Sequence, residues 1–320
     1  MNSIEVGKNE QQQRLDKFLK KYLGNAPLSY IYKAIRKDVK VNGKRAKEDT
    51  ILQLGDTVTL YISDADLAKF TKKRERTRVK RQFKIAYEDE NILVAEKPFG
   101  LLTHGDRTEK KNHLANQVVD YLIEKGDYNP RLEKTFTPAS VNRLDRNTTG
   151  LVLFGKNAET LQALNRMIRE KDKISKYYMT IVKGAVKEEL YLRDRMVKDG
   201  KTNKVKVLSM DEGGRDMETI VRPIQPGRKF TLVEVEIITG RTHQIRAHLA
   251  KAGHPVIGDV KYGDKQVNEF VRRKFNLNTQ LLHAYKLTFS GCSGNLEYLN
   301  GLEIKADLPE DFANIRRELF

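Results

Sequence analysis

The sequence predicts an α+β protein in which a mixed, mainly antiparallel central sheet with flanking helices follows a small N-terminal αα-β domain. In the larger, C-terminal part, strand-like segments outnumber helix-like ones and do not alternate with them regularly, which disfavours a doubly wound fold. A strongly basic segment separates the two parts, so we expect two domains. Hydrophobic residues make up 39% of the 320 residues, enough for a sizeable core.

The N-terminal domain, residues 1–63, is predicted from two amphipathic helices and a hairpin. Apolar residues recur at helical spacing in the first helix, which Pro27 follows, at Leu15, Phe18, Leu19 and Tyr22. The second helix is expected to begin at Ser29, a plausible N-cap. Its apolar stripe comprises Leu28, Ile31 and Ile35, and its basic stripe comprises Lys33, Arg36, Lys37 and Lys40. Asn42-Gly43 then predicts a hairpin turn, which Lys44 and Arg45 follow.

Residues 64–82 are expected to form a basic, flexible linker. The run 72–81, KKRERTRVKR, holds seven basic residues and one acidic residue. Such a run fits a solvated spacer and a nucleic-acid contact equally well, so both readings stay open.

The C-terminal domain, residues 83–320, should contain the central sheet. Strands are expected at 92–95, 151–154, 178–182, 204–208, 231–238 and 281–289, and helices at 112–125 and 159–171. The clearest strand is VEVEI, whose alternation places Val233, Val235 and Ile237 on one face.

Composition narrows the class of partner. The formal net charge of +17 makes nucleic acid the first candidate partner and an anionic membrane surface the second. No run of 18 apolar residues is present, and the first residues lack the apolar core of a signal peptide, so we expect a cytoplasmic protein. Cys292 is the only cysteine, which excludes an internal disulfide and a multi-cysteine zinc site.

Two patterns could be mistaken for functional sites. The segment GLVLFGK, 150–156, matches most of a phosphate-binding loop, but Asn157 stands where a hydroxyl residue would hold magnesium. His243 and His248 are five residues apart, without the i, i+4 spacing of a helical zinc motif or an accompanying cysteine or carboxylate. No metal site is therefore predicted.

The segment VNRLDRNTTG, 141–150, is a polar stretch that leads directly into an apolar strand. Loops at the mouth of a core element are common positions for catalytic groups. Arg143 and Arg146 flank Asp145 and should favour its ionised carboxylate, which can act as a nucleophile or a base. Taken alone, the segment fits a surface turn with Arg–Asp ion pairs better.

Two further segments carry polar groups next to strands. After Gly240, Thr242 can cap a short helix with Ile245 and Leu249 facing inward, and a helix N-terminus beside Arg241 is a candidate phosphate site. An amphipathic helix with a solvated basic face is the simpler reading. Tyr177 and Tyr178 are adjacent in a predicted strand, so one should face the core and the other can face a cleft.

Taken in order, these segments resemble the ribosomal large-subunit pseudouridine synthases over nearly the whole chain. Residues 83 to about 310 resemble the catalytic domain, and 12 to about 63 resemble the RNA-binding domain named after the fourth small-subunit ribosomal protein. The matching segments are EKPFG (96–100), RLD with TG (143–150), KYYMTIVKG (176–184) and GRTHQIRAH (240–248). Asn142, Thr149 and Thr180 depart from the family's usual His, Ser and Ala.

The resemblance implies a role for four residues. Asp145 would be the nucleophile that attacks the target uridine, at the sugar or the base, and Arg246 would hold Asp145 ionised and oriented. Tyr178 would stack on the flipped base and assist proton removal. Arg143 would fill the gap left by the extruded nucleotide. Flipping a nucleotide costs a few kcal/mol, and stacking on an aromatic ring recovers ~1–3 kcal/mol per base.

The resemblance also implies the partners. Large-subunit ribosomal RNA is the expected substrate rather than transfer RNA, with no cofactor, and a monomer is the default. Residues expected to contact RNA are Lys33, Arg36, Lys37, Lys40, Lys44, Arg45, Arg241 and His243. Two other classes remain as alternatives. One is a non-catalytic RNA-binding or ribosome-assembly factor, and the other is a hydrolase or nuclease that uses Asp145 and His243 but lacks a carboxylate cluster for metals.

Overall fold

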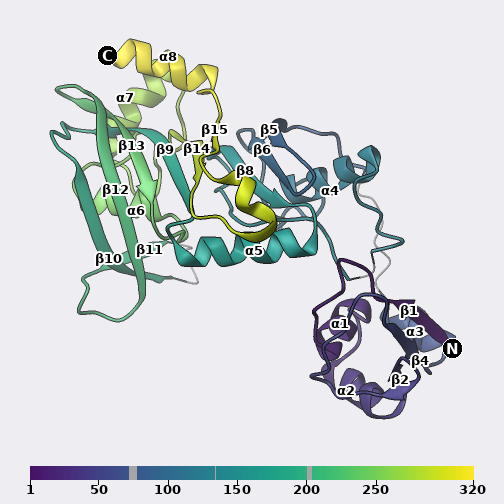
Figure 1. Ribbon diagram of the computed structural model, residues 1–320. Coiled ribbons are helices and arrows are strands. Elements are labelled where there is room, and N and C mark those ends of the chain that lie inside the picture. Colours follow the sequence, from purple (N-terminus) through teal and green to yellow (C-terminus); the bar gives the residue numbers. More distant parts are fainter. Residues whose placement is uncertain (72–77, 134, 200–203) are drawn as a thin grey trace.

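The computed structural model describes residues 1–71, 78–133, 135–199 and 204–320, which form two domains, each with its own sheet (Figure 1). This arrangement confirms the predicted α+β class and the small N-terminal unit. Among the described residues, no helix combines the length and apolar character needed to cross a lipid bilayer.

The N-terminal domain packs two helices on a four-stranded sheet of order β1-β4-β2-β3. Phe18, Leu19 and Ile35 are nearly inaccessible in the core between them. The elements are β1 (Asn2–Glu5), α1 (Leu15–Tyr22), α2 (Leu28–Lys37), β2 (Val39–Val41), β3 (Lys44–Arg45), β4 (Thr57–Leu60) and α3 (Asp64–Phe70).

The C-terminal domain is built on a sheet in which the order of strands is β11-β10-β12-β13-β9-β14-β8-β6-β5, with β15 beside β14 and β7 beside β8. The pairs are antiparallel except β14 with β8. The strands are β5 (Lys84–Glu88), β6 (Ile92–Lys97), β7 (Ala139–Ser140), β8 (Thr149–Gly155), β9 (Ile174–Lys183), β10 (Leu190–Lys198), β11 (Val205–Leu208), β12 (Arg215–Pro226), β13 (Phe230–Ile237), β14 (Leu282–Phe289) and β15 (Glu303–Lys305). The helices are α4 (Leu114–Lys125), α5 (Ala158–Glu170), α6 (Gln244–Lys251), α7 (Lys265–Phe275), the 3₁₀ helix η1 (Gly294–Leu299) and α8 (Glu310–Leu319).

Helices cover both faces of this sheet, because its central strands are apolar on both sides. On β8, Val152 and Phe154 face a core that includes residues of α4 and α6. Leu151 and Leu153 face the opposite core, under α5 and η1. The alternation predicted for VEVEI is confirmed, since Val233, Val235 and Ile237 all lie in the core shared with α4.

Three details of the N-terminal prediction are wrong. Helix α2 begins at Leu28 rather than at Ser29, because the Pro27 carbonyl already accepts from the N–H groups of Tyr30 and Ile31. Leu28 is exposed and does not join the apolar stripe. Lys40 lies on β2 and not on the helical basic stripe, because α2 ends at Lys37.

The segment expected to be a flexible linker is partly helical. Residues 64–70 form α3, which Ser63 caps by accepting from Asp66 N–H, and Phe70 packs in the N-terminal core. Much of the basic run 72–81 lies outside the described residues. Near its end, Arg81 stacks over Phe83 and Tyr121 of the C-terminal domain.

The two domains contact each other through the segment that follows β1. Ala158 N–H, at the start of α5, donates to Asn9 Oδ1 over 2.8 Å. The Thr135 hydroxyl donates to Glu10 Oε1 over 3.2 Å. The first bond joins the N-terminal domain to the start of α5, and the second joins it to the segment between α4 and β7.

Candidate active site

The loop that carries Asp145 is fixed on both sides of that residue. On one side, the backbone N–H of Leu144 donates to the Thr103 hydroxyl, which in turn donates to the Leu144 carbonyl. On the other side, Lys97 Nζ donates to the Arg146 carbonyl over 2.9 Å and to the Leu101 carbonyl over 2.7 Å. The backbone around Asp145 is therefore held by a buried hydroxyl and a buried ammonium group.

Lys97 is almost fully buried, with 1% of its surface exposed. Its Nζ also lies 3.1 Å from the Pro98 carbonyl, so three carbonyl oxygens match the three N–H donors of an ammonium group. Burial lowers the pKa of Lys97 to about 7, although the negative charge of Asp145 acts in the opposite direction.

The Asp145 side chain is bound by an arginine that a second carboxylate holds in place. Arg246 Nη1 donates to Asp145 Oδ2 over 2.9 Å. Arg246 Nε and Nη2 donate to the two oxygens of Asp259 over 2.6 and 2.9 Å, a bidentate pair. Asp259 has no exposed surface, and it also accepts from the backbone N–H groups of Lys261 and Tyr262.

These contacts keep both members of the buried pair charged. Burial disfavours the charged guanidinium, but Asp259 and then Asp145 outweigh burial and raise the pKa of Arg246. Burial likewise disfavours the Asp259 carboxylate, but Arg246 lowers the pKa of Asp259 below its usual value. Asp145 is thus bound by a cation that cannot turn away without leaving Asp259 unpaired.

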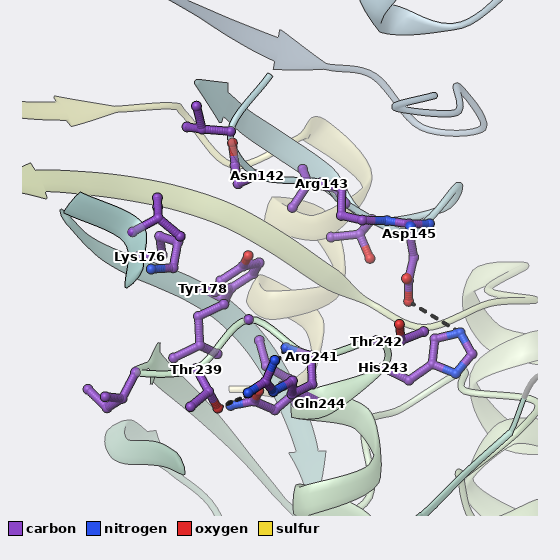
Figure 2. A pocket seen from close by; sticks show the side chains of 18 of the residues that line it. Asn142, Arg143, Asp145, Lys176, Tyr178, Thr239, Arg241, Thr242, His243 and Gln244 are labelled. Atoms are coloured by element: carbon purple, nitrogen blue, oxygen red, sulfur yellow. Dashed lines mark hydrogen bonds and ion pairs between the residues drawn. The ribbon is translucent and has the colours of Figure 1, made fainter. Parts of the chain in front are cut away.

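A pocket of ≈ 530 Å³ opens beside Asp145, between the 141–148 loop, β9 and the start of α6 (Figure 2). Tyr178 from β9 forms part of its wall, and Lys176 lies beyond Tyr178 as seen from Asp145. Burial, and then the negative charge of Asp145, raise the pKa of Tyr178 far above its usual value, so the phenol is protonated at neutral pH. Tyr177 points to the opposite face and lies under the Lys286 ammonium, as the strand alternation predicted.

His243 is the second nitrogen-bearing side chain beside Asp145, with 3.9 Å between His243 Nε2 and Asp145 Oδ2 (Figure 2). Its other nitrogen, Nδ1, lies 3.0 Å from Tyr262 Oη, which accepts from the Val205 N–H over 2.7 Å. The Tyr262 hydroxyl can then donate its hydrogen to His243 Nδ1. In that case the imidazole proton lies on Nε2, the nitrogen that faces Asp145. Burial lowers the pKa of His243, and with the charges of Arg246 and Lys261 it outweighs the opposite effect of the Asp145 and Asp259 carboxylates, so the ring is neutral at neutral pH.

Comparisons with known proteins agree with this geometry. A family model described as RNA pseudouridylate synthase matches residues 91–251, which include the Asp145 loop, β9 and α6. The chain belongs to this family. A second family model, the S4 domain, matches residues 13–58. The chain is therefore an RNA pseudouridine synthase with an N-terminal S4 domain.

Individual relatives match almost end to end. Ribosomal large subunit pseudouridine synthase C of Vibrio vulnificus (strain CMCP6) is 33% identical, over 99% of this chain and 96% of its own length. The protein of the same name from Buchnera aphidicola subsp. Baizongia pistaciae is 31% identical, over 89% of this chain and 88% of its own. The solved structure of human RNA Pseudouridylate Synthase Domain Containing 4 shares the fold, with a TM-score of 0.57 and 21% identity over 73% of this chain and 92% of that one.

The predicted site residues of this pseudouridine synthase fall into two groups. Arg143, Asp145, Tyr178, Arg241, His243 and Arg246 all line the one pocket. The others, Lys33, Arg36, Lys37, Lys40, Lys44 and Arg45, lie on the S4 domain. The members of that second group are exposed except Lys40, which is half-buried with its Nζ 5.3 Å from the centre of the Tyr61 ring.

Two local expectations about the pocket are wrong. Arg146 does not face Asp145, because its guanidinium binds Asp106 Oδ2 and the Thr108 hydroxyl outside the pocket. Thr242 does not cap α6. His243 occupies the N-cap position with a left-handed backbone at φ 53°, so Thr242 lies one residue before the helix boundary.

Sequence reasoning missed Asp259 and Tyr262 entirely, and it assigned no role to Lys97 or Lys176. Asp259 and Tyr262 lie in a stretch with no pattern of its own, and their partners come from α6 and β11. Lys176 is buried, and its Nζ donates to the Ile174 carbonyl. Burial lowers the pKa of Lys176 to about 8, while the charge of Glu236 acts in the opposite direction.

Proposed function

We propose that this enzyme isomerises specific uridines to pseudouridine in large-subunit ribosomal RNA, with Asp145 as the nucleophile and the target nucleotide flipped into the pocket. The observation that carries the proposal is the asymmetry at Asp145. Oδ2 is held by Arg246, whereas no described residue hydrogen-bonds to Oδ1. The side chain is 26% exposed, toward the pocket. One carboxylate oxygen is therefore fixed and the other is open to a substrate.

The surrounding side chains support a flipped uridine. Arg143 is exposed at the pocket rim, two residues before Asp145, where a guanidinium can occupy the space that the extruded nucleotide leaves. The Tyr178 ring can support the uracil, with about 1–3 kcal/mol available from stacking. Because the Tyr178 phenol stays protonated, it supports stacking better than proton removal as a phenolate.

The chemistry balances without another reactant. Attack by Asp145 at the ribose C1′ or at the uracil C6 allows the bond between C1′ and N1 to break. The uracil then turns, C1′ bonds to C5, and the C5 proton is lost while N1 gains one. Uridine and pseudouridine are isomers, so no group has to be supplied. Arg246 stabilises the carboxylate whenever it leaves as an anion.

The substrate is inferred from two further observations. The relatives matched over nearly their full length are named as enzymes of the large ribosomal subunit. The S4 domain presents the exposed basic residues Lys33, Arg36 and Lys37 on α2, which can bind phosphates without reading sequence.

The test is conversion of unmodified large-subunit RNA by purified protein without added cofactor, mapped by carbodiimide modification and reverse transcription. We expect conversion by the wild type and none by Asp145→Asn, with mass spectrometry to exclude deamidation back to aspartate. Asp311→Asn, at the exposed start of α8, is the matched control and should convert fully. Full conversion by Asp145→Asn would falsify the nucleophile assignment, and RNA binding by the wild type without conversion would favour a non-catalytic factor.

A further inference from the structure

Helix α5 connects the S4 domain to the active-site pocket. At its first residue, Ala158 N–H donates to Asn9 Oδ1 of the N-terminal domain. At its other end, Ile168 and Arg169 line the pocket that contains Asp145. Thirteen residues at 1.5 Å per residue give a helix of about 20 Å. An RNA that touches both the S4 domain and the pocket has to cross roughly this distance, and Figure 1 shows α5 extending toward the N-terminal domain.

The outward face of α5 is polar and hollowed. Gln162, Arg166 and Arg169 are exposed at positions i, i+4 and i+7, so they lie on one stripe of the helix. Together with Ser293 and Asn295 they line a groove of ≈ 630 Å³ between α5 and η1. Arg169 lines both this groove and the pocket, so the two hollows meet at that residue.

The charge of the groove fits a polyanion. Within the described part of the chain, neither Arg166 nor Arg169 forms an ion pair, whereas Arg222 binds three carboxylates on the sheet. Glu159 is the only acidic residue among those that line the groove, and it lies at the end near the S4 domain. Arginines without carboxylate partners, next to amide and hydroxyl donors, are the groups that commonly contact RNA phosphates.

We propose that the outward face of α5 is the path along which the RNA backbone runs from the S4 domain to the pocket, with phosphates beside Arg166 and Arg169. The proposal rests on the proposed function for the position of the target uridine. It implies that the enzyme recognises RNA on one side of the target over the length of α5, and not only the nucleotides in the pocket.

The affinity lost when Arg166 is substituted should depend on the length of the RNA. We would compare wild type, Arg166→Ala and Arg166→Glu on a large-subunit RNA fragment that contains a converted uridine and on a short hairpin centred on the same uridine. Loss of one phosphate contact should reduce the magnitude of the slope of log affinity against log salt by roughly 0.7–0.9, which corresponds to about five- to eightfold weaker binding at 0.1 M salt, taken relative to 1 M salt. Arg166→Glu should lose more affinity, and both losses should be larger for the fragment than for the hairpin.

Arg317→Ala, an exposed arginine on α8, is the matched control and should leave the salt slope unchanged. Equal losses on both RNAs, or an unchanged salt slope for Arg166→Ala, would overturn the proposed path. Binding is measured in the Asp145→Asn background as well, so the path can fail while conversion by the wild type still supports the proposed function.

Crosslinking distinguishes RNA from a protein occupant of the groove. Cys292, the only cysteine, is buried, so Arg166→Cys offers one accessible thiol for a photoreactive group. Crosslinks to nucleotides that flank the target, on one side, are the expected result. Crosslinks to protein alone in a mixture with ribosomal precursors would overturn the RNA path in favour of a protein contact.

Discussion

Substituting Asp259 by asparagine removes the charge that holds Arg246 while conserving the shape of the side chain. In the wild type, the two Asp259 oxygens accept from Arg246 over 2.6 and 2.9 Å with no exposed surface. Removing one partner of a buried ion pair costs about 3–5 kcal/mol of the free energy of unfolding. Asparagine keeps one acceptor, worth roughly 1.5–3 kcal/mol when the donor is charged, so we expect a net loss of about 2 kcal/mol.

The same substitution should slow the reaction more than it weakens RNA binding. The amide NH₂ of asparagine would oppose an Arg246 N–H group, so the guanidinium should shift, and Asp145 is hydrogen-bonded to that guanidinium. A misplacement of about 1 Å can cost roughly 100-fold in rate. Single-turnover conversion measured by tritium release from uridine labelled at C5 should therefore fall, with the Kd for RNA within about twofold of wild type, since Asp259 faces no solvent.

The pH dependence of stability gives an independent check of the same pair. Arg246 lowers the folded-state pKa of Asp259, so the stabilisation is complete above the unfolded pKa of about 3.9 and is lost as the pH falls through the lower folded value. The difference between wild type and Asp259→Asn in urea unfolding should be constant from neutral pH down to about 5 and shrink below about 4. The exposed pair of Glu269 with Arg272 is the control, and Glu269→Gln should change neither property measurably. An Asp259→Asn protein that matches the wild type in both rate and unfolding free energy would refute this account.

Three further predictions concern buried groups around the pocket. Lys97→Met leaves carbonyl oxygens such as that of Arg146 without their donor, so urea unfolding should show a loss of roughly 1–3 kcal/mol for each buried acceptor left unpaired. Lys176 has a folded pKa of about 8 against 10.5 in the unfolded chain, so between these values the unfolded state holds more protons and stability rises with pH. From pH 8 to pH 10 the wild type should gain about 2 kcal/mol relative to Lys176→Met, and an unchanged difference would contradict the lowered pKa. Nitrogen NMR of His243 at neutral pH should show the proton on Nε2 in the wild type, and a proton on Nδ1 would contradict the hydrogen bond from Tyr262.

The sequence could predict the features that depend on local periodicity. Alternation placed Val233, Val235 and Ile237 on one face, and they lie in one core. The expected helices at 112–125 and 159–171 correspond to α4 and α5 within two residues. Element boundaries were predicted less accurately where backbone hydrogen bonds decide them. The Pro27 carbonyl accepts the first hydrogen bonds of α2, so the helix begins at Leu28, one residue before the predicted Ser29.

Residues of the site could be predicted only where they lie within one of the sequence motifs. The ordered motifs located Asp145, Tyr178 and Arg246, and the fold brings them to one pocket. Asp259 was not predictable, because an isolated aspartate in a loop carries no local sign of the buried arginine that it binds. Lys97 illustrates the same limit, since a lysine is expected at the surface unless the carbonyls that surround it are known.

The buried charges around Asp145 also explain why the loop itself can be polar and still well placed. Three supports act on it from different parts of the chain: Thr103 at Leu144, Lys97 at the Arg146 carbonyl, and Arg246 at the carboxylate. Each places a polar or charged group in the interior, which costs desolvation that surrounding burial of apolar side chains must offset. Such an arrangement is not the most stable way to fill this volume. It does hold one carboxylate oxygen in place while leaving the other without a described hydrogen-bond partner, which is what the proposed attack on a flipped nucleotide would require.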